Sequence, residues 1–319
     1  MKTCHLSSVH PRGDTRIFHK ECKSLARAGY DVSLIVKSEK DEVLDGVKII
    51  AIREENGRLG RMTRAVRAVY QKALERDADI YHFHDPELIP VGILLRLRGK
   101  KVIYDVHEDV PRQILSKPWI APWLRYPVAC GSALAEWVGS RFFFSRVVAA
   151  TPLIAQRFPK RKTKTVQNFP ILKELVRPNP TGYSQRPENV VYIGGISRIR
   201  GALEHIKAFE SVRSKNCRFV MAGSFESGEL EEECKALKGW ARVDFKGWLD
   251  RRQVAELLDG ARVGLVALHP VPNHIRAYPV KLFEYMSAGI PVIASDFPLW
   301  REIVEGANCG LLVDPMKPL

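Results

Sequence analysis

Short apolar runs alternate along the chain with segments whose apolar residues recur at helical spacing, as in residues 203–212. This alternation favours parallel sheets with helices packed on them. Strands are predicted in the first half at 2–7, 31–36, 47–52, 80–84, 101–106, 147–150 and 165–167, with helices that include 16–28 and 63–75. In the second half, strands are predicted at 190–193, 218–222, 242–245, 263–267, 291–294 and 310–313.

The pattern starts afresh after residues 168–187, a stretch that contains four prolines and one glycine. We therefore predict an α/β protein with two Rossmann-like domains, residues 1–170 and 188–319, joined by a linker at 171–187. A length of 319 residues agrees with two cores, because single cores stop growing at roughly 250–300 residues. Ligands of such sheets bind beyond the carboxyl ends of the strands, so the two domains are expected to face each other across a cleft.

The composition excludes several classes of protein. Apolar residues make up 45% of the chain, too many for a disordered protein. The net charge is +14, and residues 1–172 hold 30 basic and 18 acidic side chains, a net of +12. Basic residues concentrate at 57–67 and 160–164, which indicates either a solvated surface or an anionic partner of the first half. No nucleic-acid-binding motif is present, so nucleic acid is not the expected partner.

Residues 115–148 interleave aromatic side chains, Trp119 among them, with lysine and arginine. This mixture suits the inner face of a membrane, although packing against a sheet explains many of the aromatics equally well. No run approaches the roughly 20 apolar residues of a membrane span, and no signal peptide is visible. The six cysteines lack metal or redox spacing and are expected to be reduced, so we predict a cytoplasmic protein, peripheral on the membrane at most.

Residues 279–295 predict a helix followed by a strand. Pro279 suits the first helical position and Gly289 the C-terminal cap. The helix start offers free N–H groups to a phosphate, and Lys281 adds a positive charge. Glu284 lies one turn on, where its carboxylate can accept hydrogen bonds from the vicinal hydroxyls of a ribose. Alternatively, Lys281 and Glu284 are ordinary surface residues of an amphipathic helix.

Residues 192–201 predict a strand, a glycine-bearing loop and the start of a helix. Gly194 and Gly195 allow backbone to approach a phosphate closely, and Arg198 and Arg200 can neutralise a leaving diphosphate. The loop is not the dinucleotide fingerprint, and no nucleoside-triphosphate loop pattern occurs in the chain.

These two segments, in this order and at this separation, resemble the retaining glycosyltransferases of family 4, which have the GT-B fold. The resemblance extends over nearly the whole chain. Within the family, the sequence is similar to the branch of bacterial enzymes that build surface polysaccharides. The further segments that carry it are 8–18, 82–88, 104–109, 295–304 and 310–315.

The resemblance implies a role for each matching residue on the donor side. Glu284 matches the glutamate that holds the donor ribose, and Arg200 matches the basic residue that grips the diphosphate. Lys281 lies beside the same group. The implied donor is a UDP- or GDP-sugar, and no cofactor or metal ion is implied.

On the acceptor side, His107 matches a histidine that touches the transferred sugar. The loop of residues 8–14, with His10, Gly13 and Asp14, matches a loop near the donor phosphates and the acceptor. The acceptor implied by this branch is a lipid-linked or other saccharide. Glu108 is a weaker alternative, as a general base.

The sequence departs from the family pattern in three places. Arg276 stands where the family has the first glutamate of a pair, and Gly195 stands where it has an arginine that Arg198 would replace. The family continues with further helices beyond 310–313, so the C-terminal domain is expected to be incomplete at Leu319.

His82 and His84 with Asp85 have a spacing that suggests a metal site. The two histidines share a strand face, and the sequence shows no fourth ligand beside them. We therefore expect a structural role for them and no metal site.

The predicted activity is transfer of a sugar from a nucleoside diphosphate sugar to a saccharide or glycolipid acceptor, with retention of configuration and without a metal. Two alternatives stay open. One is a catalytically inactive GT-B binding protein, and the other is a non-hydrolysing sugar-nucleotide epimerase, which shares the architecture.

Overall fold

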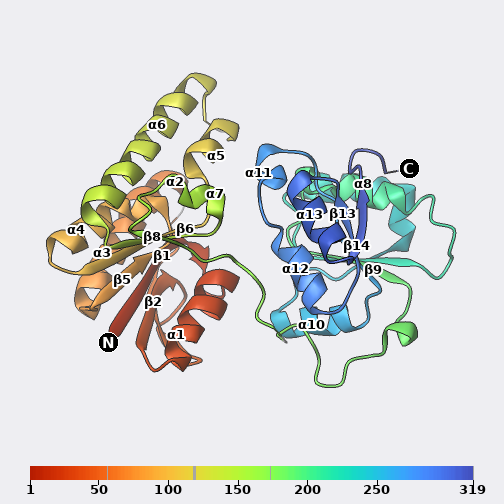
Figure 1. Ribbon diagram of the computed structural model, residues 1–319, viewed down its shortest axis with the longest axis horizontal. Helices are drawn as coiled ribbons and strands as arrows, with labels where there is room; N and C mark the ends of the chain where they lie inside the picture. The colour runs from red at the N-terminus through yellow and green to blue at the C-terminus, as the bar shows by residue number, and fades with distance from the viewer. Residues whose placement is uncertain (56, 118–119, 173, 319) are drawn as a thin grey trace. The chain divides into compact units, whose positions relative to one another are not determined.

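The computed structural model describes residues 1–55, 57–117, 120–172 and 174–318, without the side chains of residues 58, 59, 61 and 116. Trp119 and the side chains of Arg58 and Arg61 therefore lie outside the described residues. The chain divides into two compact units, Met1–Asn168 and Phe169–Leu319, which are drawn together in Figure 1. Each unit has its own sheet and its own hydrophobic core.

The described residues of the first unit form an eight-stranded sheet in the order β3-β4-β2-β1-β5-β6-β7-β8. Neighbouring strands are parallel except for β3, which pairs antiparallel with β4. Five consecutive buried residues in β2, 32–36, show the continuous apolar run expected of a sheet covered on both faces. The strands are β1 (Lys2–Pro11), β2 (Asp31–Lys37), β3 (Glu42–Leu44), β4 (Val47–Ile52), β5 (Ile80–Phe83), β6 (Lys101–Val106), β7 (Arg146–Ala149) and β8 (Thr163–Thr165).

The helices of the first unit fall between these strands. They are η1 (Thr15–Cys22), α1 (Lys23–Arg27), α2 (Gly57–Gly60), η2 (Arg61–Ala65), α3 (Val66–Arg76), η3 (Pro86–Leu88), α4 (Ile89–Leu97), α5 (Val110–Ser116), α6 (Pro122–Val138), η4 (Gly139–Phe143) and α7 (Pro152–Ala155). Segments η1, η2 and η4 have π-helical winding. Figure 1 shows α6 projecting away from the sheet of its own unit, with α5 beside it.

The described residues of the second unit form a six-stranded parallel sheet in the order β11-β10-β9-β12-β13-β14. Its largest fully buried side chains include Trp300 and Tyr285. The strands are β9 (Asn189–Ile193), β10 (Arg218–Ala222), β11 (Val243–Phe245), β12 (Val263–Val266), β13 (Val292–Ser295) and β14 (Gly310–Val313). The helices are η5 (Tyr183–Gln185), η6 (Arg198–Arg200), α8 (Ala202–Ala208), α9 (Gly228–Ala236), η7 (Lys238–Arg242), α10 (Arg251–Asp259), α11 (Pro272–Ile275), α12 (Val280–Ser287) and α13 (Pro298–Gly306).

Several boundaries differ from the predicted ones. The strand expected at 165–167 is β8, which ends at Thr165, and β3 was not predicted. The helices expected at 16–28 and 63–75 each begin with π-helical winding and continue as an α-helix. Pro279 is the N-cap of α12 and not its first helical residue.

The proline-rich stretch expected to be a linker packs on the second unit. Leu175 is buried in that unit's core, and the carboxylate of Asp259 accepts hydrogen bonds from both the N–H and the hydroxyl of Thr181 at 2.8 Å. Arg186 donates to the carbonyl of Ala261 at 3.1 Å. These contacts make residues 169–187 part of the second unit, because buried side chains and paired backbone groups fix them to α10 and to the residues after it.

Candidate functional site

Each sheet has one place where the chain leaves two neighbouring strands toward opposite edges of the sheet, so that the strand order reverses there. In the first unit it lies between β1 and β5, and in the second between β9 and β12. Open α/β sheets bind their ligands beyond the carboxyl ends of the strands at such a switch point. The residues singled out from the sequence follow β1, β5 and β6 in one unit, and β9 and β12 in the other.

In the second unit, the loop after β9 is shaped around two cationic side chains. Gly194 has a φ of +125°, and a Cβ there would lie 2.6 Å from Cε of Lys281. A Cβ on Gly195 would lie 2.7 Å from Nη1 of Arg200. The two glycines therefore leave the space that Lys281 and Arg200 occupy beside the loop, and the positive φ of Gly194 itself favours glycine.

Tyr192 joins these groups. Its hydroxyl donates to the carbonyl of Gly195 at 2.7 Å and accepts from Nζ of Lys281 at 2.8 Å. The Lys281 ammonium also lies 3.9 Å from the centre of the Tyr192 ring, within cation–π range. Arg200 donates to the same carbonyl of Gly195 at 3.2 Å. Tyr192 therefore fixes the loop and Lys281 together.

The charge of Lys281 is poorly compensated. Burial, and then the neighbouring Arg200, hold the pKa of Lys281 well below its ordinary value, against the opposing effect of Glu284. A low lysine pKa means that the charged form lacks favourable partners. An anion bound beside Lys281 and Arg200 would supply the missing negative charge.

Helix α12 is held in register with this loop. The Tyr285 hydroxyl accepts a hydrogen bond from the N–H of Ile193, the last residue of β9, at 3.1 Å. Gly264 in β12 leaves room for the Tyr285 ring, since a Cβ there would lie 2.3 Å from it. No side chain caps the N-terminus of α12, and the N–H of Leu282 donates to the carbonyl of Pro279 at 3.0 Å. The N–H groups of Val280 and Lys281 are therefore the ones that the helix start can offer to a ligand.

Glu284 lies one turn into α12 and is part of an ion-pair chain. Nη1 of Arg251 donates to Glu284 at 2.7 Å, and Nη2 of the same side chain donates to Glu174 at 2.8 Å. All three side chains are half-buried or better. The guanidinium thus fixes the Glu284 carboxylate, and one arginine stands between two carboxylates.

Two arginines lie elsewhere. Arg198 pairs with Glu233 at 2.6 Å, and its backbone N–H donates to Glu226. Arg198 is therefore not placed with Arg200 in this structure. Arg276 is exposed and follows the short helix α11.

In the first unit, the carboxyl ends of β1, β5 and β6 carry a layer of buried polar side chains. The parallel register aligns His5 with His82, and His84 follows two residues on, so the three imidazoles share one face of the sheet. Their ring centres lie 4.7–5.2 Å apart. Burial lowers the pKa of both His82 and His84 to about 3.

Asp105, at the end of β6, is the anionic centre of this layer. Nε and Nη2 of Arg16 donate to its two oxygens at 3.2 and 2.9 Å. His107 Nε2 lies 3.0 Å from Oδ2 of the same carboxylate, and His84 Nδ1 lies 3.3 Å from it. Asp105 thereby orients His107, whose side chain remains partly exposed.

The carboxyl end of β1, where the strand register is irregular, is held by Asp85. Residues 8–11 of the predicted loop therefore belong to this strand. The backbone N–H of Ser8 donates to Oδ2 of Asp85 at 2.6 Å, and the hydroxyl of Ser7 donates to it at 2.9 Å. Nδ1 of His10 lies 2.9 Å from the other oxygen. Despite its burial, the Asp85 carboxyl has a pKa of about 2, because His10 and these donors favour the anion. The ring centres of His10 and His107 lie 5.5 Å apart.

The other two predicted residues of this loop have separate roles. The Asp14 side chain accepts from the N–H groups of Arg16 and Ile17 at 2.9 and 2.8 Å, and so caps η1. Gly13 is exposed, and a Cβ there would meet nothing within 4 Å. Glu108 pairs with Gln113 on α5.

Several residues of these two sites were not predicted. His5 and Glu21 lie against His82 and His84 and offer the further ligand atoms that the sequence did not show beside these two histidines. Arg251 and Glu174 belong to no recognised motif. The available signal was weak, since His5 was only a polar residue inside an apolar strand.

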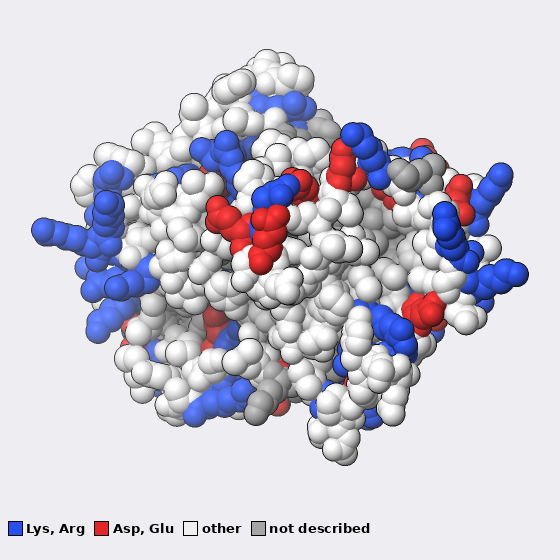
Figure 2. Space-filling model, turned by 45° about the vertical axis from the view of Figure 1, so that its right-hand side comes forward, with Lys and Arg blue, Asp and Glu red and all other residues white. Residues whose placement is uncertain are grey.

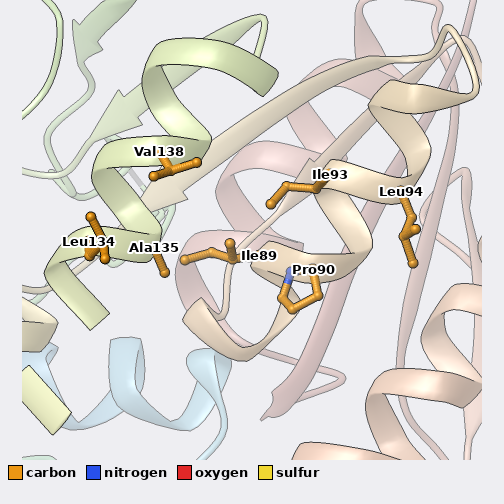
Figure 3. A pocket seen from close by; sticks show the side chains of 7 residues that line it. All are labelled: Ile89, Pro90, Ile93, Leu94, Leu134, Ala135 and Val138. Atoms are coloured by element: carbon orange, nitrogen blue, oxygen red, sulfur yellow. The ribbon is translucent and has the colours of Figure 1, made fainter. Parts of the chain in front are cut away.

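An apolar groove lies between α4 and α6 of the first unit. Figure 3 shows Ile89 and Ile93 of α4 pointing toward the side of α6 that carries Ala135 and Val138. Further along the same unit, Trp123 and Tyr126 of α6 are 75% and 71% exposed. The Arg141 guanidinium lies 4.6 Å from the ring centre of Trp137. The two aromatics at the N-terminal end of α6 are therefore exposed, and the one at its C-terminal end lies against an arginine.

Basic side chains do not form one continuous patch on the face drawn in Figure 2. Lysines and arginines gather there in separate groups, with acidic side chains beside several of them. Among the described residues, no helix is both long enough and apolar enough to cross a bilayer.

Comparison with known protein families agrees with the division into two units. Residues 13–167 match the family described as "Glycosyl transferase 4-like domain", and residues 187–318 match "Glycosyl transferases group 1". Among curated proteins, an alpha-D-kanosaminyltransferase from Streptomyces kanamyceticus is 24% identical over 139 residues. That match covers 43% of this chain and about a third, 34%, of the relative's own length.

Solved structures share the fold at low sequence identity. Sucrose-phosphate synthase from Thermosynechococcus elongatus has a TM-score of 0.73 at 17% identity, covering 99% of this chain and 86% of that one. Anabaena Alr3699/HepE in complex with UDP-glucose scores 0.71 at 18% identity, covering 100% and 86%. WaaG, a glycosyltransferase involved in lipopolysaccharide biosynthesis, scores 0.72 at 16% identity, covering 98% and 86%. The two α/β units therefore have the GT-B fold.

Proposed function

Because the chain belongs to the GT-B glycosyltransferases, with a glycosyl transferase 4-like domain followed by a group 1 domain, we propose that it transfers a sugar from a nucleoside diphosphate sugar to a saccharide acceptor. The observation that carries this proposal is the second-unit site. Arg200 and Lys281 lie there beside the glycine loop, at the switch point of the sheet, with too few negative partners.

The donor diphosphate would bind at this loop. Gly194 and Gly195 keep the backbone clear of side chains, and the uncapped start of α12 adds N–H donors. When the glycosidic bond to the diphosphate breaks, negative charge builds on the leaving group. Arg200 and Lys281 would stabilise that charge, and preorganised electrostatic stabilisation is usually the largest catalytic contribution. On this proposal the leaving group needs no metal ion.

Glu284 would hold the ribose of the donor. Arg251 already fixes one oxygen of this carboxylate, and a carboxylate has further lone pairs for the two vicinal hydroxyls. UDP and GDP are the two candidate nucleotides. Anabaena HepE, which shares the fold, was solved in complex with UDP-glucose.

The first unit would bind the acceptor. His107 is oriented by Asp105 and partly exposed, and His10 lies beside it at the end of β1, which Asp85 fixes. These groups can donate to and accept from sugar hydroxyls. We propose that transfer retains the configuration of the sugar, as the resemblance of both halves to family 4 implies.

The acceptor would be lipid-linked and presented at a membrane. Trp123 and Tyr126 are exposed at the N-terminal end of α6, and Arg141 lies over the Trp137 ring at its C-terminal end. Exposed aromatic and basic side chains are typical of a membrane interface. The excess of basic residues in the first half agrees with an anionic bilayer surface. We therefore propose that the enzyme acts at the inner face of the membrane, in contact with the cytoplasm.

Calorimetric titration with UDP and GDP tests the donor site first. We expect one of the two to bind, and Glu284→Ala to abolish the heat of binding. Glu302→Ala is the matched control, because Glu302 is an exposed glutamate on α13 of the same unit. Loss of binding in both variants, or in neither, would contradict the assignment of Glu284.

A turnover assay then separates transfer from the alternatives. With the nucleotide sugar that binds, we expect release of the nucleoside diphosphate to require a saccharide or glycolipid acceptor, and added Mg²⁺ or Mn²⁺ to leave the rate unchanged. Conversion of the donor sugar in the absence of any acceptor would indicate an epimerase and contradict the proposal. Tight nucleotide binding without turnover on any acceptor would favour an inactive binding protein.

A further inference from the structure

The first unit contains a buried group of four potential metal ligands that the proposed reaction does not use. His5 comes from β1, Glu21 from η1, and His82 and His84 from β5 and the residue after it. One ligand atom from each lies within 4.8 Å of the other three. The three imidazoles are more than nine-tenths buried, and Glu21 is half-buried.

The distances from Glu21 fit a ligand of an ion better than they fit a hydrogen bond. Oε2 of Glu21 lies 3.8 Å from Nδ1 of His5 and 4.0 Å from Nε2 of His84, both too long for a hydrogen bond. These two nitrogens lie 3.0 Å apart and hydrogen-bond to each other, so an ion bound by both would replace that bond. A point equidistant from the three atoms can lie about 2.1 Å from each, which is the length of a bond from zinc to nitrogen or to carboxylate oxygen.

Unpartnered polar atoms face this group. Neither oxygen of Glu21 accepts a hydrogen bond, although Nε of Arg16 lies 3.0 Å from Oε1. Nε2 of His82 also lacks a hydrogen-bond partner. Buried polar atoms of folded proteins are nearly always paired, so three such atoms in one place call for a missing partner.

The neighbouring Asp105 completes the arrangement expected around a metal-binding histidine. His84 directs Nε2 toward Glu21 and His5, while its other nitrogen, Nδ1, lies 3.3 Å from the Asp105 carboxylate. A histidine that binds a metal usually donates its second N–H to a carboxylate in this way. Asp105 and Glu21 also place two carboxylates beside one guanidinium, that of Arg16.

We propose that His5, Glu21, His82 and His84 bind one divalent transition-metal ion, Zn²⁺ by its preference for three imidazoles and one carboxylate. The four protein ligands close the coordination shell, so the ion is structural and leaves no position for substrate. The ion joins η1 to β1 and β5. It thereby also fixes His84, and through Asp105 the orientation of His107.

A second group, His84 with Asp105 and His107, also has ligand spacing. Arg16 already binds both oxygens of Asp105, so that carboxylate is occupied and its charge is compensated. The group that contains Glu21 is therefore the one that we assign to the ion.

The test is the metal content of the full chain, purified without a metal-affinity step and dialysed against metal-free buffer. Elemental analysis should find about one Zn²⁺ per chain. After removal of zinc, addition of Co²⁺ should give the intense visible absorption of four-coordinate cobalt, and Zn²⁺ should raise the melting temperature. Less than about a tenth of an equivalent of metal, with no cobalt bands in a folded protein, would overturn the proposal.

Variants identify the ligands. Glu21→Gln keeps the size of the side chain and removes the anionic ligand, and His82→Asn removes one imidazole. Both should lose the cobalt bands and the thermal shift. His205→Gln, at a buried histidine of the second unit, and His107→Asn, beside the group but outside it, should retain them. If Glu21→Gln binds cobalt with an unchanged spectrum, the assignment of the ligands is wrong. If a variant fails to fold, the metal content of the parent chain still decides whether an ion is present.

Discussion

The two switch points of the molecule handle charge in opposite ways. In the first unit, Asp105 and Asp85 are buried and each accepts several hydrogen bonds from its surroundings. In the second unit, Arg200 and Lys281 face a glycine loop that offers one carbonyl and one tyrosine hydroxyl. In the first unit, the buried charges have hydrogen-bond partners within the protein, except in the group of His5, Glu21, His82 and His84. In the second unit, the two cations lack negatively charged partners.

The difference indicates which groups orient neighbouring side chains and which groups bind a ligand. A fully paired carboxylate such as Asp105 orients its neighbours and changes little when a ligand arrives. A cation with few partners gains most from an incoming anion, because a bound diphosphate restores its charged form. We therefore expect substitutions in the second unit to affect donor chemistry directly, and those in the first unit to act on the acceptor and on stability.

The strongest test of this comparison is Arg200→Ala. Removing a group that stabilises the leaving diphosphate should lower kcat by about 10²–10³, the range found for single electrostatic contacts to a transition state. Steady-state kinetics with donor and acceptor measure this effect. Arg198→Ala is the matched control and should change kcat less than threefold, because Arg198 pairs with Glu233. Equal losses in both variants would show that the diphosphate site has been misplaced.

Acid pH should expose a buried neutral group in the second unit. Burial lowers the pKa of His205 to about 4, from an ordinary value of 6.5. Its neutral form is the folded one, so its contribution to stability is complete above pH 6.5 and is lost as the pH falls toward 4. The loss should reach about 3 kcal/mol, at 1.36 kcal/mol per pH unit.

Urea unfolding at several pH values measures this dependence as the difference between the parent chain and His205→Gln. The glutamine amide can still donate to the carbonyl of Ala267, which lies 2.8 Å from Nε2 of His205. An unchanged pH dependence in His205→Gln would mean that other groups dominate the acid response of this unit.

Gly223→Ala tests how closely the loop after β9, which contains Gly194 and Gly195, is packed against its neighbours. Gly223 has a φ of +143°, and a Cβ there would lie 2.0 Å from the carbonyl oxygen of Gly194. We expect a loss of about 2 kcal/mol in the free energy of unfolding, together with weaker nucleotide binding, because the loop must move. Gly228→Ala is the control, since nothing lies within 4 Å of its Cβ. A stable Gly223→Ala protein with normal nucleotide binding would show that the loop is not rigid.

The smallest expected effect concerns α6. The double variant Trp123→Ala with Tyr126→Ala should leave the free energy of unfolding unchanged within about 0.5 kcal/mol, because both side chains are exposed. Its affinity for vesicles that contain anionic lipid should fall roughly tenfold. Vesicle co-sedimentation at low and high salt measures the contribution of the aromatic side chains and that of electrostatic attraction to the anionic lipid. Unchanged binding, or binding by the parent chain that does not depend on salt, would argue against the proposed membrane surface.

The fold could be predicted from the sequence because buried parallel strands have a strong apolar signature. Strand β3 escaped because it has only three residues and its side chains are half-exposed or exposed. The stretch 171–187 was misjudged for a different reason. Prolines and a glycine indicate a linker, but they do not reveal that Leu175 is buried or that Asp259, far along the chain, binds Thr181.

The candidate site was predictable where local sequence determines it. The glycines after β9 and the residues at the start of α12 belong to motifs, and in the structure the side chains of Arg200 and Lys281 both contact the loop after β9. Their long-range partners were not predictable. Arg251 lies 33 residues from Glu284 and 77 from Glu174, and nothing in the spacing links them. The pairing of Arg198 with Glu233 was equally unpredictable, because it depends on tertiary structure.

The π-helical winding of η1 has a consequence for how the length of this segment can vary. Arg16 and Glu21 are five residues apart, a spacing that α-helical winding would turn to different sides of the helix. A chain shortened by one residue between them could wind as an ordinary α-helix and still align the pair. A chain lengthened by one residue would separate the pair by six residues, and neither α-helical nor π-helical winding would then bring the two side chains to the same side. We therefore expect this segment to tolerate a deletion more readily than an insertion, an asymmetry that a library of single-residue length variants would show.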